Sequence, residues 1–60
     1  MEKVTPDQVK KARETAGHTQ TQAAAVIYKK LLAWQRYESG GREMDQAFYE
    51  LYLIKTGQSV

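Results

Sequence analysis

Apolar and polar positions along this chain follow the period of an α-helix, and the first such segment covers residues 6–16. One face of it carries four residues at the spacing i, i+3, i+4 and i+7, namely Val9, Ala12, Arg13 and Ala16. Thr5 is suited to be the N-cap, with Pro6 at the first helical position and Gln8 completing a capping box. Gly17 is suited to end this helix in a left-handed conformation.

A second helix is predicted to begin directly after His18, because the stretch TQTQ repeats the same start signal. Thr19 is its expected N-cap, and Gln22 is the partner in a second capping box. The inward face of this helix is formed by Gln20, Ala23, Ala24 and Ile27. Because alanines are small, they let a neighbouring helix approach closely, and the sequence therefore predicts a tight helix crossing.

The third predicted helix starts near Leu31 and has two sides of different character. At about 100° per residue, Trp34 and Tyr37 fall on one side, which predicts that they are core anchors. The opposite side combines aliphatic, polar and cationic groups, namely Leu32, Gln35 and Arg36, with Leu31 at the boundary. A serine and two glycines at 39–41 end this helix.

A fourth helix is predicted from about Met44 to Thr56, before Gly57. Counted from Met44, its core side consists of Met44, Ala47, Phe48, Leu51 and Ile54. The large side chains that then point away from the core are Tyr49, Tyr52 and Leu53. Because exposed aromatic and apolar side chains mark interfaces, these three are predicted to join two copies of the chain as a homodimer.

Together these elements predict an all-α fold, a compact four-helix domain covering residues 1–60 with an ordered core of about 5–56. A chain of 60 residues makes one small domain. It contains no cysteine, which excludes a disulfide framework and a thiolate zinc site. The sequence shows neither a signal peptide nor an apolar span long enough for a membrane, and this predicts a cytoplasmic protein without a membrane partner.

The charged residues carry no recognisable catalytic pattern. The net charge of +2 permits a nucleic-acid partner without requiring one. The seven acidic residues are scattered and form no carboxylate pair, metal-spaced cluster or nucleophile–base set. His18 is the single histidine, and its place in a one-residue linker predicts a capping or exposed role. We therefore predict no enzyme, no metal site and no cofactor.

Several features of residues 17–42 follow one another in the order of a known family. They are Gly17, Thr19 and Gln20 at the start of the second helix, the small Ala24, the apolar Trp34 and Tyr37, and the ending Glu38, Gly40 and Arg42. In this combination the stretch GHTQTQAAAVIYKKLLAWQRYESGGR resembles the Xre/Cro family of helix-turn-helix regulators, which includes the phage repressors. The segments WQRYESG and FYELYLIKTG are most similar to small phage regulators, including some encoded beside anti-CRISPR genes. The resemblance implies a lambda-repressor-like fold whose second and third helices form the DNA-binding unit.

Two positions depart from the family pattern. Tyr28 stands in the turn where the family usually has glycine, and a tyrosine at positive φ is strained. Lys29 follows at a position that is usually apolar in the family. Both changes bear on the geometry of the turn and on the docking angle of the third helix.

The resemblance also implies a set of DNA contacts. The residues it places at base edges in the major groove are Lys30, Leu31, Leu32, Gln35 and Arg36. The residues it places at phosphates are Gln20, Lys29 and Arg42. Arg13 and Glu38 match positions where the family has a partly buried ion pair joining the first and third helices.

The function predicted in this way is that of a sequence-specific DNA-binding transcriptional regulator. We expect a phage-type repressor that binds a palindromic operator in double-stranded DNA as a homodimer, with no small-molecule effector. The alternative is a protein-interaction module, antitoxin-like or binding a host protein, in which Leu31, Leu32 and the tyrosines form the partner-binding patch. Salt separates the two, because phosphate contacts weaken steeply with ionic strength and an apolar protein interface does not.

Overall fold

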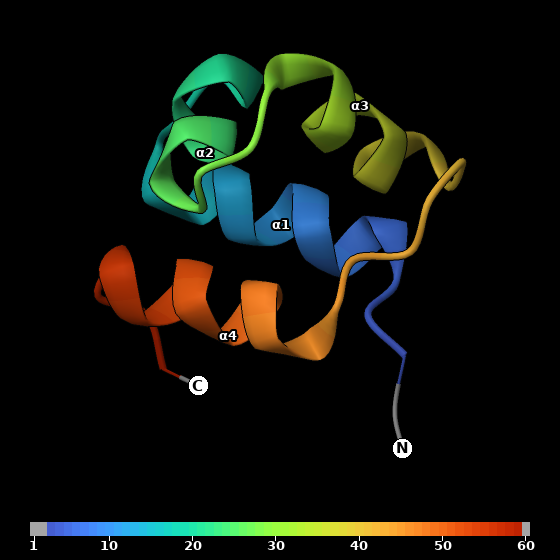
Figure 1. Cartoon of the computed structure of the whole chain (residues 1–60). Helices are drawn as coiled ribbons and strands as arrows, with labels where there is room; N and C mark the ends of the chain where they lie inside the picture. Colours follow the sequence, from blue (N-terminus) through green and yellow to red (C-terminus); the bar gives the residue numbers. More distant parts are fainter. Residues whose placement is uncertain (1–2, 60) are drawn as a thin grey trace.

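The computed structural model describes residues 3–59, which form four α-helices joined by short linkers (Figure 1). The helices are α1 (Pro6–Ala16), α2 (Gln20–Val26), α3 (Leu31–Ser39) and α4 (Gln46–Lys55). The all-helical prediction is confirmed, and no β-strand occurs in the part of the chain that is described. Residues 1, 2 and 60 of the predicted domain lie outside it.

The first two helices begin with the capping boxes that the sequence predicts. Gln8 donates its backbone N–H to the hydroxyl of Thr5 at 3.2 Å, and its side-chain oxygen accepts from the backbone of Thr5 at 2.8 Å. Thr19 and Gln22 make the same exchange at 3.2 Å and 2.9 Å. Each box satisfies two backbone groups that a helix start leaves without a helical partner.

Three of the helices, α1, α2 and α4, end in the same left-handed backbone arrangement, the Schellman motif. In α2 its hydrogen bonds run from Lys29 to the carbonyl of Ala24 at 2.9 Å and from Tyr28 to the carbonyl of Ala25 at 3.2 Å. The left-handed residue is Gly17 after α1 and Gly57 after α4, with φ of 73° and 75°. After α2 it is Tyr28, with φ of 61°. A left-handed conformation costs a residue with a Cβ about 1–2 kcal/mol.

The buried core draws on every helix, on the segment before α1 and on the two linkers that flank α3. Its members are Val4, Val9, Ala12, Ala23, Ala24, Ile27, Trp34, Tyr37, Met44, Tyr52 and Leu53. Trp34 lies at the centre, with its ring centroid 5.0 Å from that of Tyr52 and 6.4 Å from that of Tyr37. The predicted anchoring role of Trp34 and Tyr37 is confirmed, and the alanines of α2 leave room for these large rings.

The predicted orientation of α4 is wrong in part, although Phe48 and Leu51 are partly buried and pack against the core as expected. Tyr52 and Leu53, expected to face outward, are 0% and 7% exposed, whereas Ile54 and Ala47, expected in the core, lie at the surface. The prediction counted the helix from Met44, but Met44 is buried from the linker and α4 begins only at Gln46. Its burial therefore says nothing about which side of α4 faces inward.

In Figure 1, α1 runs through the middle of the view, with α3 above it and α4 below it. The described residues span 27 × 26 × 18 Å. None of these helices combines the length and the apolar character needed to cross a membrane.

Candidate functional site

The outer side of α3 is the surface to which the sequence assigned the candidate contacts. Leu31 is 40% and Leu32 58% exposed, and Lys30, Gln35 and Arg36 are exposed as well. The predicted division of this helix into a buried and an exposed side is thus confirmed. The five candidate base-reading residues lie on one continuous segment that begins at the N-cap of α3.

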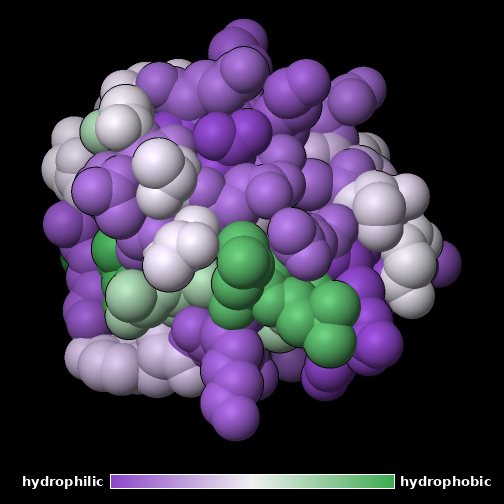
Figure 2. Space-filling view, turned by 90° about the horizontal axis from the view of Figure 1, so that it is seen from above, coloured by the Kyte–Doolittle hydropathy of each residue, from purple (hydrophilic) through white to green (hydrophobic). Residues whose placement is uncertain are grey.

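The charge around this surface has one sign. Between Glu14 and Glu38 the sequence contains no acidic residue, so α2 and most of α3 carry only neutral and cationic groups. This run without acidic residues is a signal in the sequence that the family resemblance alone did not use. Figure 2, which looks down on the side of the molecule that is uppermost in Figure 1, shows a few hydrophobic groups surrounded by hydrophilic residues. The surface therefore combines a small apolar centre with a polar and cationic surround.

An ion pair fixes α3 against α1. The Arg13 guanidinium donates from Nε to Glu38 Oε2 at 2.6 Å and from a terminal nitrogen to Oε1 at 3.2 Å. A further terminal N–H of Arg13 reaches the carbonyl of His18 at 3.1 Å, and the indole N–H of Trp34 also donates to Glu38. The side chains of Arg13 and Glu38 are 18% and 9% exposed, which confirms the predicted, partly buried pair.

This network determines the charge state of Glu38. Burial alone raises the pKa of this carboxyl, but the hydrogen bonds from Arg13 and Trp34 and the charge of Arg13 outweigh it. The pKa of Glu38 is therefore held below its ordinary value of 4.5. The only acidic group of α3 is neutralised by its partner and adds little negative field to the outer side of the helix.

The three predicted phosphate contacts are placed differently from one another. Gln20 is the first residue of α2 and is half-buried. Its side-chain amide carries two N–H donors. Arg42 is exposed just beyond the C-terminal end of α3.

The side chain of Lys29 packs against α4 and not on the outer side of α3. Its ammonium group sits 4.4 Å from the centre of the Phe48 ring on α4. The reason is the left-handed turn at Tyr28, which reverses the chain after α2 so that the next side chain packs back toward the body of the protein. The structure thus shows a contact of Lys29 with α4, and its phosphate contact stays a prediction.

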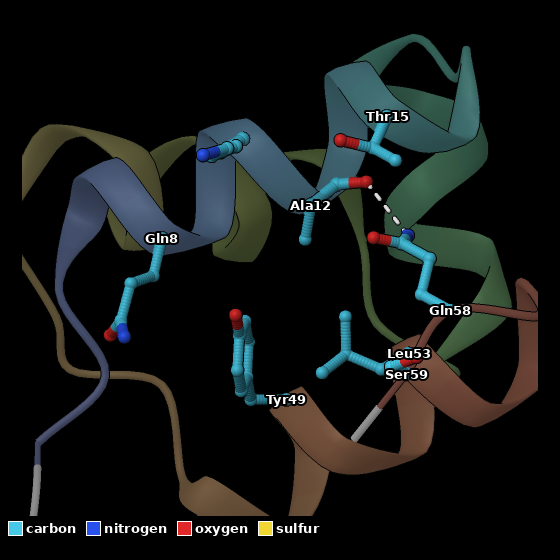
Figure 3. A pocket seen from close by; sticks show the side chains of 8 residues that line it. Gln8, Ala12, Thr15, Tyr49, Leu53, Gln58 and Ser59 are labelled. Carbon is cyan, nitrogen blue, oxygen red and sulfur yellow. Dashed lines mark hydrogen bonds between the residues drawn. The ribbon is translucent and has the colours of Figure 1, made fainter.

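The three predicted dimer contacts are not brought together at the surface. Tyr52 and Leu53 belong to the core, as described above, and Tyr49 is half-buried. Tyr49 instead lines a pocket of about 280 Å³ between α1 and α4, shown in Figure 3. The pocket is lined by Gln8, Lys11, Ala12, Thr15, Tyr49, Leu53, Gln58 and Ser59. Gln58 closes one side of it by donating to the carbonyl of Ala12 at 3.0 Å.

His18 has a structural contact that its sequence position did not reveal. Its Nδ1 lies 3.0 Å from the hydroxyl of Tyr52, so the ring provides the hydrogen bond that a buried tyrosine needs. This contact joins residues 34 positions apart in sequence. Among residues 3–59 no three His, Cys, Asp or Glu side chains gather in a way that could hold a metal ion.

Comparisons with known proteins assign no family to the chain. No protein-family model matches it, and no curated protein is significantly similar to it in sequence. The case for its function therefore depends on the residues and surfaces described above.

Proposed function

We propose that the protein is a sequence-specific DNA-binding regulator in which α2 and α3 form a helix-turn-helix unit. The observation that carries the proposal is the outer side of α3, where polar, cationic and aliphatic side chains project together from a helix anchored by Trp34 and Tyr37. An α-helix fits the major groove of B-DNA, where each base pair presents a distinct pattern of donors and acceptors. The absence of acidic residues between Glu14 and Glu38 keeps this surface compatible with phosphates.

Each exposed side chain of α3 has a chemical role in this proposal. Gln35 suits the N6 and N7 edge of adenine, and Arg36 suits the O6 and N7 edge of guanine. Leu32 suits a thymine methyl group, while Leu31 and Lys30 approach bases at the start of the helix.

Two further residues position the protein on the DNA backbone. Arg42 and Gln20 contact phosphates at the two sides of α3, and such contacts fix the register without reading sequence.

The proposal is tested by selecting bound duplexes from a random pool and titrating the enriched sequence and a scrambled one by fluorescence anisotropy. Gln35→Ala and Arg36→Ala are expected to cost about 1–3 kcal/mol on the enriched sequence and little on the scrambled one. Lys11→Ala is the matched control for charge, because Lys11 lines the pocket between α1 and α4. Failure to enrich any sequence, or equal losses on both duplexes for both α3 variants, would overturn the proposal.

A protein-interaction module is the second candidate, favoured by the adjacent exposed leucines Leu31 and Leu32. In that case Leu32→Ala weakens binding to the partner and salt has little effect. The affinity of DNA binding through phosphates instead falls by about tenfold for every two phosphate contacts when the salt concentration rises from 50 mM to 200 mM. Repeating the titration at these two salt concentrations separates the candidates.

As a regulator the protein is expected to act by occupying an operator and blocking polymerase. A palindromic site read by two copies fits this mode, since one short helix reads few base pairs. A reporter gene placed behind the enriched sequence measures the direction of regulation: repression is expected, and activation would contradict this mode.

A further inference from the structure

The end of α2 differs from the ends of α1 and α4 in one respect. All three have the same pair of backbone hydrogen bonds, and α1 and α4 place glycine at the left-handed position. At the end of α2 this position is Tyr28, whose side chain is 77% exposed. Because this side chain is not buried, packing in the core does not offset the backbone strain. Any offset to the strain of a tyrosine at this position must therefore come from a surface contact of the side chain.

That contact is made by Lys55 at the C-terminal end of α4. The ammonium group of Lys55 lies 2.5 Å from the hydroxyl of Tyr28 and 4.1 Å from the centre of its ring, so it approaches the ring from the hydroxyl end. The same group donates to the carbonyl of Val26, the last residue of α2, at 3.2 Å. A lysine at a helix C-terminus satisfies a carbonyl that has no helical partner and interacts favourably with the helix dipole.

The next residue of the linker also takes part in a lysine–aromatic contact with α4, but here the linker supplies the lysine and α4 the ring. Lys29 places its ammonium over the ring of Phe48 on α4, whereas Tyr28 offers its own ring to a lysine of α4. We call these two lysine–aromatic pairs the linker clasp. The clasp joins α4 to the segment that leads directly into α3, and its Lys55 lies 27 positions after Tyr28 in sequence.

We propose that the linker clasp positions α3 on DNA, with Tyr28 and Lys55 as positioning residues that do not themselves touch the DNA. The role rests on the function proposed above. A linker with glycine at residue 28 closes the same backbone turn without strain but has no side chain to hold it against α4. The clasp restricts the angle at which α3 leaves the linker, and this angle determines whether Gln35 and Arg36 reach base edges together.

The experiment compares Tyr28→Gly and Lys55→Met with the wild type, using the ratio of affinities for the enriched and the scrambled duplex. Tyr28→Gly removes the strain together with the Tyr28–Lys55 pair of the clasp. Because these two changes oppose each other in stability, its melting temperature is expected to stay close to that of the wild type. Its affinity ratio is nevertheless expected to fall by roughly threefold to thirtyfold, the range in which residues outside a site change binding at it. Lys55→Met keeps the aliphatic stem, loses the ammonium group and is expected to lower the ratio similarly.

Two further variants separate positioning from folding. Lys55→Arg keeps a cation and a donor and is expected to restore most of the ratio. Tyr28→Phe keeps the ring and loses only the hydroxyl. Combining it with Lys55→Met is expected to lower the affinity ratio little further than Lys55→Met alone, because both changes remove the same hydrogen bond. Backbone order parameters of residues 28–30 are expected to fall in both Tyr28→Gly and Lys55→Met.

The outcomes distinguish this inference from the proposed function. A wild type without sequence preference overturns both. A wild type with sequence preference, whose ratio is unchanged in Tyr28→Gly and Lys55→Met, overturns the positioning role alone. A loss of ratio that follows only from a loss of folded protein at the temperature of measurement also overturns it.

Discussion

At the scale of single residues, Glu38 makes more contacts than any other acidic side chain described above. Its carboxylate accepts hydrogen bonds from Arg13 on α1 and from Trp34 one turn earlier on α3. The charged group therefore joins α1 to α3. Because this group is only 9% exposed, each donor depends on it for satisfaction.

Replacing Glu38 by alanine is expected to lower the free energy of unfolding by about 2–3 kcal/mol, since it leaves the guanidinium of Arg13 and the indole N–H of Trp34 without their partner. Glu14→Ala is the control, because Glu14 is exposed on α1 and such a change costs within about 0.5 kcal/mol. Urea unfolding followed by tryptophan fluorescence measures both. Equal midpoints for the two variants would mean that the ion pair is solvated in solution.

The same carboxylate makes stability depend on pH. Its pKa is lowered in the folded protein, so the folded state binds this proton less readily than the unfolded chain does. The contribution is fully present above the unfolded value of about 4.5 and is lost as the pH falls through the folded pKa. Wild type is therefore expected to lose more stability between pH 5 and about pH 3 than Glu38→Gln, which has no proton to gain. Parallel pH profiles of the melting temperature would contradict this assignment.

At the scale of elements, α4 owes its orientation to large side chains that fill the space left by the alanines of α2. Tyr52 reaches the ring of Trp34 and is satisfied by His18, and Leu53 lies beside it in the core. The other side of the helix carries Ile54, which is 63% exposed.

Substitutions at neighbouring positions of α4 are consequently expected to differ sharply in how much stability they cost. Tyr52→Ala and Leu53→Ala each create a cavity and are expected to cost about 3–5 and 2–4 kcal/mol of stability. Ile54→Ala, the matched control one residue further, is expected to cost less than about 1 kcal/mol. Thermal unfolding by circular dichroism measures the three, and a larger loss for Ile54→Ala than for Leu53→Ala would restore the orientation predicted from the sequence.

At the scale of the whole molecule, the length of α3 limits how many base pairs one copy could contact in the proposed function. Nine residues rise about 13 Å along the helix axis, which spans only about four base pairs of B-DNA. If the proposed function holds, a single copy would read a short sequence, and two copies related by a two-fold axis would read a palindrome. The surface available for such pairing on α4 is its outer side with Ile54, and not the buried Tyr52 and Leu53.

We expect two chains on each palindromic duplex, measured by sedimentation equilibrium of the protein with DNA. Ile54→Glu is expected to weaken this pairing, because it replaces the exposed large apolar side chain of α4 by a charge. Ser59→Glu adds the same charge at another exposed position and is expected to leave the stoichiometry unchanged. A complex with one wild-type chain on each duplex would refute the dimer.

The sequence by itself determined the features that depend on residues close together in the chain. The bounds of α1 and both capping boxes follow from side chains three positions apart, and the two sides of α3 follow from helical periodicity once its start is known. The pairing of Arg13 with Glu38 spans 25 positions, and it was predicted only through a family resemblance.

Only the tertiary structure decided the contacts that depend on how the helices pack. The inward side of α4 was mispredicted because Met44 is buried outside the helix, so that its burial does not define the helical phase. The side chain of Lys29 packs on Phe48, and Lys55 reaches Tyr28 across 27 positions, contacts that no local pattern indicated. A long, flexible lysine side chain has many rotamers of similar energy in the isolated chain, and the partner that it meets is selected by the elements brought beside it during folding.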